Sequence, residues 1–432
     1  MDLSTVRMLR PTRTGIVTVT AASAAVAGVV VLGLAPSASA GPRRGPLPLG
    51  DSGLPETRRS EAIAPGVSLT RIVRGQGPAP AGEIGRTTKG PWRVDVLTID
   101  PAHARGHLRA TPGPDLKRAE PTTALVRGAG ALAGINASFF SFTDSVEYPG
   151  ELVGLGLFGG RLLSEPSANP AETHLFVDAS TSKVSVGRFR WAGSVQNRRT
   201  KASLGVKAVN RPPVVPAPCA GTPGGATCTA AGEIVRFTHD FAPSTPPGPG
   251  AEVVLGSGGC VVRTSTARGT ALLPGQTSLQ ATGDQVAPLL RTATGCLTHV
   301  DVLKNEAGKR IPLRSRHFAV SGRYRLLDRG KVVVPAGKSY FFGRHPRTLA
   351  GATRDGKIIL ATIDGRRVTS VGASLAETAA VAKSLGLYDA VNLDGGGSTT
   401  MSVRGTLTNQ PSGSRERSVG DALVFVDSRY RA

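Results

Sequence analysis

The chain consists largely of short apolar runs that are separated by residues able to turn the backbone. Glycine and proline contribute 55 and 32 of its 432 residues, and β-branched runs of four to eight residues between such breakers are typical of strands. One helix is predicted around Pro121–Arg127 and a second begins at Ser374. Together these signals predict an α+β fold, a strand-rich mixed-sheet domain with a few packed helices. The predicted strands are Val94–Ile99, Leu155–Phe158, His174–Val177, Gly205–Val209, Ile234–Thr238, Glu252–Leu255, Val300–Leu303, Lys331–Val334 and Lys357–Ile363.

The second helix has the clearest local signal. Ser374 and Glu377 form the S-x-x-E pattern of a capping box, in which both side chains satisfy free amides of the first turn. Gly386 is a typical C-terminal cap. A buried strand is predicted next, at Tyr388–Leu393. With Lys357–Ile363 before the helix, the segment forms a strand–helix–strand unit, and we expect its two strands to run parallel.

The first 40 residues have the composition of an export signal. Three arginines precede an uncharged apolar segment, 15–35, and Ala38-Ser39-Ala40 fits a cleavage site. An uncleaved membrane anchor is the alternative, because the apolar segment is nearly long enough to span a bilayer. We expect residues 1–40 to be a cleaved signal peptide and the protein to be secreted or extracytoplasmic, with association with the cell wall as one such location.

The segment after the signal has a different composition. Residues 41–90 are rich in proline, glycine and arginine and show little periodicity, which is typical of a linker. One short strand is predicted within it, near Val67–Val73. Ordered structure is predicted to begin at Trp92, so the folded domain is expected over residues 91–432.

Four cysteines support export. They are Cys219, Cys228, Cys260 and Cys296, and no two form a C-x-x-C pair, so neither a zinc knuckle nor a redox dithiol is indicated. Three pairings are open. We favour the one in which Cys219–Cys228 closes a short loop and Cys260–Cys296 ties two strands. Disulfides agree with export, because they persist in exported proteins.

The net charge is strongly positive. Lysine and arginine number 52 against 30 aspartates and glutamates, which gives +22. Such a surface favours phosphates, nucleic acid, anionic lipid or an anionic wall polymer, with general solubility as the alternative explanation. Because the basic residues are dispersed and no nucleic-acid motif is present, no nucleic-acid partner is predicted. Contact with a membrane is predicted only through an uncleaved signal segment.

The segment 392–401, NLDGGGSTTM, is the best candidate for chemistry. Asp394 follows a buried strand, and three glycines and three hydroxyl residues come after it. Glycines allow a sharp turn and close approach of amide groups to an anion. The segment is not a P-loop, since no lysine follows the glycines, and the chain contains no G-x-S-x-G elbow. A tight turn capped by Asp394 is the structural alternative.

Several other positions have the residue types that a phosphate or sugar site needs. Arg347 lies where a loop enters a strand and is a candidate to clamp phosphate. Asn136 ends an apolar run and precedes two phenylalanines. Arg417 lies in the segment RERSV, and Asp364 ends the strand Lys357–Ile363. A surface arginine, a turn asparagine and core phenylalanines are the structural alternatives.

At these positions the chain resembles the phosphodiester glycosidase family. The resemblance rests mainly on the segment from Arg347 to Met401, which includes SLAETAAVAKSLGLYDAVNLDGGGSTTM. GINASFF is similar to the family's N-G-G-F-F segment, and RERSV to its closing E-R-P-V segment, so that the resemblance covers about 90–428. Ala137 and Ser138 replace two glycines of the family pattern, SGRYRLL lacks the usual G-G-P, and Ser418 replaces a proline. We expect the first change to narrow the pocket near Asn136.

The resemblance implies a secreted hydrolase that cleaves the sugar C1–O bond of a glycosyl phosphodiester, as in the family member that removes N-acetylglucosamine from a phosphodiester. We predict a wall-polymer or exopolysaccharide substrate. Asp394 is the leading catalytic carboxylate and Asp364 a weaker second, while Glu377 caps its helix. The residues predicted to bind substrate or phosphate are Asn136, Arg347, Thr348, Asn392, Gly395, Gly396, Gly397, Ser398, Thr399 and Arg417.

The predicted partner is an anionic sugar phosphate or glycan, and no cofactor is required. A divalent cation near Asp394 is left open, because no ligand set can be read from the sequence. The alternative function is a non-catalytic secreted binder of anionic wall glycans, or an accessory protein of exopolysaccharide export. The scarcity of aromatic residues, 4% of the chain, argues against that alternative, because sugar-binding platforms usually stack on Trp or Tyr.

Overall fold

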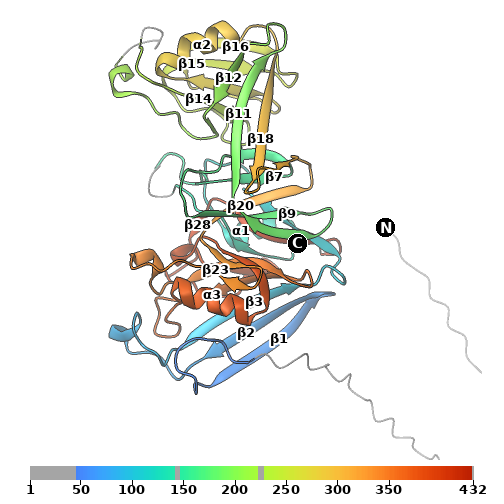
Figure 1. Cartoon of the computed structure of the whole chain (residues 1–432), viewed down its shortest axis with the longest axis vertical. Coiled ribbons are helices and arrows are strands. Elements are labelled where there is room, and N and C mark those ends of the chain that lie inside the picture. The colour runs from blue at the N-terminus through green and yellow to red at the C-terminus, as the bar shows by residue number, and fades with distance from the viewer. Residues whose placement is uncertain (1–44, 142–145, 222–227, 431–432) are drawn as a thin grey trace, which may run out of the picture. The chain divides into compact units, whose positions relative to one another are not determined.

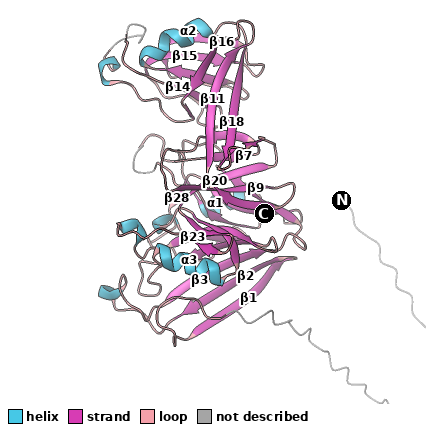
Figure 2. Cartoon of the chain, viewed as in Figure 1, coloured by secondary structure: helices cyan, strands magenta, loops and turns pink. Residues whose placement is uncertain are grey.

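The computed structural model describes residues 45–141, 146–221 and 228–430. The predicted signal peptide therefore lies outside the described residues. Strands dominate the described part of the chain, as Figure 2 shows. Its α-helices are three short ones, α1 (Thr122–Gly128), α2 (Val286–Thr292) and α3 (Leu375–Ser384). The predicted excess of strands is confirmed, but the fold is mostly β, with less helix than an α+β class implies.

The largest sheet has eight strands in the order β1-β2-β3-β24-β23-β25-β21-β22, and every neighbouring pair is antiparallel. The strands are β1 (Glu56–Ala64), β2 (Val67–Arg74), β3 (Trp92–Ile99), β24 (Ile358–Ile363), β23 (Arg347–Thr353), β25 (Leu387–Asn392), β21 (Arg325–Asp328) and β22 (Lys331–Val332). We refer to it as the main sheet.

The segment predicted to be a linker belongs to the main sheet. β1 and β2 form a hairpin, and β2 pairs with β3 along its whole length (Figure 1). Leu47 and Leu49 are buried, and the buried Arg74 guanidinium donates to the carbonyls of Leu49 and Asp51 at 2.7 and 2.8 Å. Order therefore begins well before Trp92. Composition was misleading because β1 lies at the sheet edge and exposes polar side chains, as edge strands commonly do.

The predicted strand–helix–strand unit is present in the main sheet. Ser374 and Glu377 form the capping box of α3, and Gly386 follows the helix with a φ of +81°. β24 and β25 each pair antiparallel with β23. They therefore run in the same direction, with β23 between them rather than side by side. α3 covers β21 and β25 with buried side chains such as Leu375 and Ala379 (Figure 1).

A five-stranded antiparallel sheet shares the largest hydrophobic core with the other face of the main sheet. Its order is β27-β26-β6-β29-β4, and α1 packs on β6, β26 and β29. The polypeptide passes from β25 of the main sheet to β26 of this sheet through residues 393–400. The strands are β4 (Gly106–Thr111), β6 (Ala133–Asn136), β26 (Met401–Val403), β27 (Thr406–Leu407) and β29 (Ala422–Asp427). β5 (Glu120–Pro121) and β28 (Ser418–Val419) form a separate two-stranded antiparallel sheet.

Three further sheets complete the described residues. One has the order β10-β9-β20-β7-β8, with β7 (Gly156–Phe158), β8 (Arg161–Ser164), β9 (Glu172–Asp178), β10 (Lys183–Gly187) and β20 (His317–Arg323). A second has the order β12-β11-β18-β19, with β11 (Phe189–Asn197), β12 (Ser203–Val206), β18 (Leu297–Asn305) and β19 (Arg310–Ile311). The third has the order β13-β14-β17-β15-β16 and is packed by α2, with β13 (Ala208–Val209), β14 (Ile234–Thr238), β15 (Gly248–Leu255), β16 (Val261–Arg268) and β17 (Thr277–Ala281).

The favoured disulfide pairing is confirmed. Cys219 is bonded to Cys228, and Cys260 is bonded to Cys296. The second bond joins the residues that directly precede β16 and β18. No helix among the described residues has both the length and the apolar character needed to cross a membrane.

Candidate active site

The predicted glycine turn lies between two sheets. The main-chain N–H of Asp394 donates to the carbonyl of Ala137 at 2.9 Å, and that of Gly396 donates to the carbonyl of Pro346 at 2.9 Å. The Gly395 N–H donates to the Asp394 carboxylate at 2.9 Å. These amides are therefore committed within the protein. The turn holds Asp394 in place, in contrast to the predicted cradle of amides from Gly395 to Thr399.

The glycines of this turn make room for arginine side chains. A Cβ atom on Gly397 would lie 2.4 Å from Nη2 of Arg417, and one on Gly396 would lie 3.2 Å from Nη2 of Arg366. Gly396 also has a φ of +61°, which disfavours other residues. The sequence analysis singled out Arg417 but missed Arg366. Guanidinium groups, rather than backbone amides, thus supply the positive charge beside the turn.

Asp394 is partly exposed and has a shifted pKa. Burial raises the pKa of its carboxyl group to about 6. The Ser398 hydroxyl, the Arg417 guanidinium, the Gly395 N–H and Arg323 oppose this rise. A carboxylate with a pKa near 6 is suited to exchange protons at neutral pH.

A second carboxyl group near Asp394 was missed by the sequence analysis. Asp421 is completely buried at the start of β29, and its carboxylate accepts from the N–H and hydroxyl groups of Ser138 at 2.6 and 2.8 Å. Burial, and to a smaller extent the charge of Asp394, raise the pKa of Asp421 to about 7. Ser138 is one of the residues that replace glycine in the family pattern, and here it anchors Asp421.

Asn136 joins three segments rather than facing an open site. It is fully buried; its Oδ1 accepts from the Thr348 hydroxyl at 2.8 Å and the Thr400 N–H at 3.0 Å, and its Nδ2 donates to the Asp394 carbonyl at 2.7 Å. Thr348 is therefore part of the same clamp. Asn392 is also buried, and its Nδ2 donates to the Leu393 carbonyl at 3.0 Å. The geometry favours positioning roles for all three predicted substrate contacts.

The side chain of Arg347 donates hydrogen bonds to backbone carbonyls. Its Nε donates to the Ala373 carbonyl at 3.0 Å, and its Nη2 donates to the carbonyls of Phe341 and Gly343 at 2.6 and 2.7 Å. Burial, and secondarily the charge of Arg366, lower the pKa of Arg347 to about 10. These contacts hold the loop before β23, in contrast to the predicted phosphate clamp.

Asp364, the predicted weaker catalytic carboxylate, lines a different cavity. It is buried, and its two oxygens accept from the Asn409 amide at 2.8 Å and the Gln410 N–H at 3.0 Å. Burial raises its pKa to about 6. Its cavity, about 410 Å³, also contains Asp95. Asn409 in turn donates to the Thr399 carbonyl at 3.1 Å, so Asp364 supports the turn indirectly.

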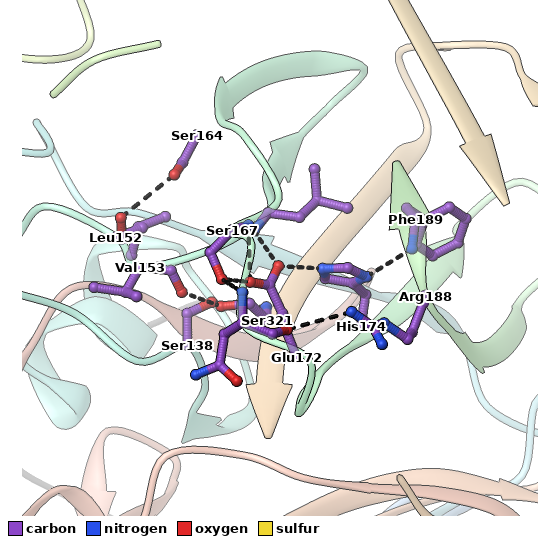
Figure 3. A network of polar contacts seen from close by, with 12 residues as sticks. Ser138, Leu152, Val153, Ser164, Ser167, Glu172, His174, Arg188, Phe189 and Ser321 are labelled. Carbon is purple, nitrogen blue, oxygen red and sulfur yellow. Dashed lines mark hydrogen bonds and ion pairs between the residues drawn. The ribbon is translucent and has the colours of Figure 1, made fainter. Parts of the chain in front are cut away.

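Another cavity has a volume of about 260 Å³ and is lined by Arg323, whose charge lowers the pKa of Asp394. Its other lining residues are Phe139, Val153, Ser167, Asn169, Glu172 and Gly322. The Arg323 guanidinium lies over the Phe139 ring, 4.4 Å from its centroid. We call this cavity, which Arg323 and Glu172 both line, the Glu172 cavity. Figure 3 shows that Glu172 is held between His174 and Ser167. Burial opposes ionisation of Glu172, but these hydrogen bonds prevail and lower its pKa. Neither Glu172 nor Arg323 was among the predicted site residues.

No group of three or more His, Cys, Asp or Glu side chains that would suit a metal ion occurs among the described residues.

The comparison with protein families identifies the region that contains this site. Residues 250–426 match the family model described as phosphodiester glycosidase. This match to the phosphodiester glycosidase family covers 177 of the 432 residues, which is less than half of the chain. It includes Asp394, Asp421 and the three arginines around them, whereas Asn136 and Glu172 precede the matched phosphodiester glycosidase region.

Similar proteins support the fold of this phosphodiester glycosidase region and of the strands before it. A crystal structure of a protein named as exported, from Burkholderia pseudomallei, has a TM-score of 0.73 and 25% identity, and the match covers 88% of this chain and 98% of that one. A hypothetical protein from Synechocystis has a TM-score of 0.62 and 20% identity over 87% of this chain and 69% of its own. The uncharacterised SPbeta prophage-derived protein YomE of Bacillus subtilis is 36% identical over 93 residues, which are 20% of this chain and 14% of YomE.

Proposed function

We propose that this protein is an exported glycosidase that hydrolyses the C1–O bond of a sugar phosphodiester. The observation that carries the proposal is the surroundings of Asp394. Its carboxyl group has a pKa of about 6, and Arg366 and Arg417 approach the glycines beside it. A carboxylate next to guanidinium groups supplies what hydrolysis of a glycosyl phosphate requires, a proton acceptor near C1 and positive charge at the phosphate.

The leaving group reduces the demands on the protein. When the C1–O bond breaks, the electron pair goes to the phosphate oxygen, and a phosphate monoester leaves as a weak base. A strong general acid is therefore less necessary than in ordinary glycoside hydrolysis. Water forms the new bond to C1 and loses a proton to Asp394, while the arginines stabilise the charge on the departing phosphate.

Asp421 has a positioning role in this proposal. It is completely buried and both of its oxygens are held by Ser138, so it is not placed to touch a substrate. Its interaction with Asp394 is electrostatic. The pKa of Asp421 lies above that of Asp394, so Asp394 ionises first and its charge helps to keep Asp421 protonated while Asp394 titrates.

The substrate class and location extend the same proposal. Two disulfides favour an oxidising compartment, and the similar Burkholderia protein is named as exported. The charge of +22 favours an anionic substrate. We therefore propose a wall polymer or exopolysaccharide that contains sugar phosphodiesters.

The first experiment measures release of free sugar from UDP-sugars and simple sugar phosphodiesters by the full chain. The matched variant is Asp394→Asn, which keeps the oxygen that accepts from Gly395. Release by the wild-type protein alone would support the proposal. Equal release by the folded variant would remove Asp394 from the reaction. Binding of these compounds without any turnover would favour the non-catalytic binder.

A further inference from the structure

A larger groove lies outside the site described above. It has a volume of about 820 Å³. Its lining consists of residues 165–168, residues 188–193 at the start of β11, residues 206, 207 and 211 at and after the end of β12, and Glu306. Its most informative lining residues are Ser167, Arg188, Arg190, Trp191, Lys207 and Arg211. We call it the Trp191 groove. All of these residues precede the region 250–426 that matches the family model.

The groove is lined by four basic side chains and by two acidic ones, Glu165 and Glu306, so its net charge is positive. Arg190 and Lys207 are exposed, and neither forms a salt bridge with any of the described residues. Arg211 differs, because both of its terminal nitrogens pair with Glu233, at 2.9 and 2.8 Å. Arg211 thus stabilises the wall, while Arg190 and Lys207 are available to an anionic ligand.

Trp191 forms a supported aromatic surface in this groove. A Cβ atom on Gly193 would lie 2.1 Å from the Trp191 ring, so the ring lies directly over that glycine. The indole Nε1 donates to Asp301 at 2.9 Å, which fixes the ring orientation. Trp191 remains partly exposed. Trp191 also packs against two hydrophobic clusters. A partly exposed indole ring held in this way is suited to stack on a sugar ring, since its polar edge is satisfied.

The Trp191 groove adjoins the Glu172 cavity. Ser167 lines both. Figure 3 shows the polar contacts along this boundary, in which Glu172 contacts Ser167 and His174, and the Phe189 N–H donates to His174 Nδ1 at 3.1 Å. The Glu172 cavity is also lined by Gly322, and a Cβ atom on Gly322 would lie 2.4 Å from the carbonyl oxygen of Asn392, two residues before Asp394. A chain of lining residues therefore leads from the candidate active site to the Trp191 groove.

We infer that the Trp191 groove binds the polymer part of an anionic glycan whose sugar phosphodiester reaches Asp394. Trp191 stacks on a sugar ring of the polymer, and Arg190 and Lys207 pair with its phosphate or carboxylate groups. This inference deepens the proposed function and rests on it. It predicts that a polymeric substrate binds more tightly than a short one, through contacts that take no part in bond cleavage.

Tryptophan fluorescence of the full chain tests binding separately from turnover. The chain contains two tryptophans, and Trp92 is fully buried, so a change on titration reports on Trp191. The probe is poly(glycerol phosphate) that carries N-acetylglucosamine, and dextran of equal length is the neutral control. We expect the anionic probe alone to change the fluorescence, with a Kd that weakens as salt is raised.

Two variants separate charge from the aromatic surface. Arg190→Ser with Lys207→Ser is expected to raise Kd for the probe about tenfold, roughly the effect of losing two charged contacts. The matched control, Arg59→Ser with Lys331→Ser, removes the same charge from exposed positions outside the groove and is expected to leave Kd unchanged. Gly193→Ala displaces the Trp191 ring without a change in charge and is expected to weaken binding and reduce the fluorescence change.

The outcomes distinguish this inference from the proposed function. Equal effects of both double variants, or equal binding of dextran, would overturn the role of the groove while leaving sugar release from short substrates intact. Groove-dependent binding of the polymer without release of sugar from any substrate would overturn the proposed function and support the binding role of the groove. With both correct, the groove variants raise KM for the polymer and leave kcat/KM for UDP-N-acetylglucosamine unchanged.

Discussion

Asp394 and Asp421 are electrostatically coupled across two segments of the chain. Burial and the charge of Asp394 together raise the pKa of Asp421 to about 7. Asp394 itself has a pKa of about 6. Two coupled carboxyl groups can have different roles when one is exposed and the other is buried. The exposed group can contact a substrate, and the buried group interacts with it electrostatically. Asp394 is partly exposed and Asp421 is not.

Replacing Asp394 with asparagine is expected to abolish most catalysis without unfolding the protein. Asparagine keeps an oxygen for the Gly395 N–H but cannot accept a proton from water, so kcat for sugar release should fall by about 10²–10⁴. Steady-state kinetics give the rate, and circular dichroism with thermal melting checks the fold. A loss of less than threefold would contradict the assignment.

The rate of sugar release should rise with pH through about 6. The base form of Asp394 is the ionised one, and it is populated above its pKa of about 6, so kcat/KM increases from pH 5 to pH 7. Asp421 has a pKa of about 7 and is mostly protonated through this range, so Asp421→Asn should leave the ascending limb near pH 6. A limb moved to lower pH in a folded, active Asp421→Asn variant would show instead that Asp421 is ionised while Asp394 titrates.

Gly397→Ala tests the approach of Arg417 to the turn. The added Cβ would lie 2.4 Å from Nη2 of Arg417, so the guanidinium must move. We expect kcat/KM for a sugar phosphodiester to fall about tenfold, about 1.4 kcal/mol of transition-state stabilisation. Gly53→Ala is the control, because no atom lies within 4 Å of its added Cβ. Equal kinetics of the two variants would argue against phosphate binding by Arg417.

Asn136→Ala distinguishes a structural clamp from a substrate contact. The variant leaves the Thr348 hydroxyl, the Thr400 N–H and the Asp394 carbonyl without this partner. Denaturant unfolding should show a loss of about 2–4 kcal/mol of stability. At a temperature where the variant is folded, KM should stay close to the wild-type value. A large rise in KM with unchanged stability would instead restore the predicted substrate contact.

Asp95 is expected to make the protein less stable at neutral than at acidic pH. Burial, and next the charge of Asp364, raise its pKa from 3.8 to about 7. The folded state therefore binds a proton that the unfolded state releases, so stability is present below pH 4 and decreases as pH rises to about 7.

The variant Asp95→Asn removes this pH dependence. A shift of this size corresponds to at most about 4 kcal/mol, so the variant should be more stable than wild type at pH 8 by a part of that amount. Glu83→Gln, at an exposed position, is the control. Urea unfolding at pH 5 and pH 8 makes the comparison, and identical pH slopes for wild type and Asp95→Asn would disprove it.

Local signals in the sequence predicted local structure well. The capping box of Ser374 and Glu377 and the cap at Gly386 depend on residues within one or two turns of each other, and all are present. The β-branched runs became strands for the same reason. The strand β2 was predicted near Val67–Val73, but β1 was taken for part of a linker, since an edge strand needs few apolar residues and composition does not show its pairing with β2.

The site was predicted only in part because its partners are distant in sequence. Asp394 was identified from the strand and glycines beside it. Asp421 was not, because its environment is made by Ser138, 283 residues earlier in the chain. Arginine is a residue type that often binds phosphate, but in the fold the Arg347 guanidinium donates its hydrogen bonds to the backbone carbonyls around it.

By itself the sequence determined the strand-rich character, the helix caps, a turn with a carboxylate and glycines, and a basic chain with four cysteines. These properties follow from neighbouring residues and from composition. Only the tertiary structure decided which charges meet. It brought Arg366 and Arg417 to the glycines beside Asp394. It also buried Asp421 next to Ser138, and it placed Asn136 and Arg347 where their side chains hydrogen-bond to backbone groups. Hydrogen bonding and desolvation act through space, so roles that depend on them are set by the packing of sheets rather than by order along the chain.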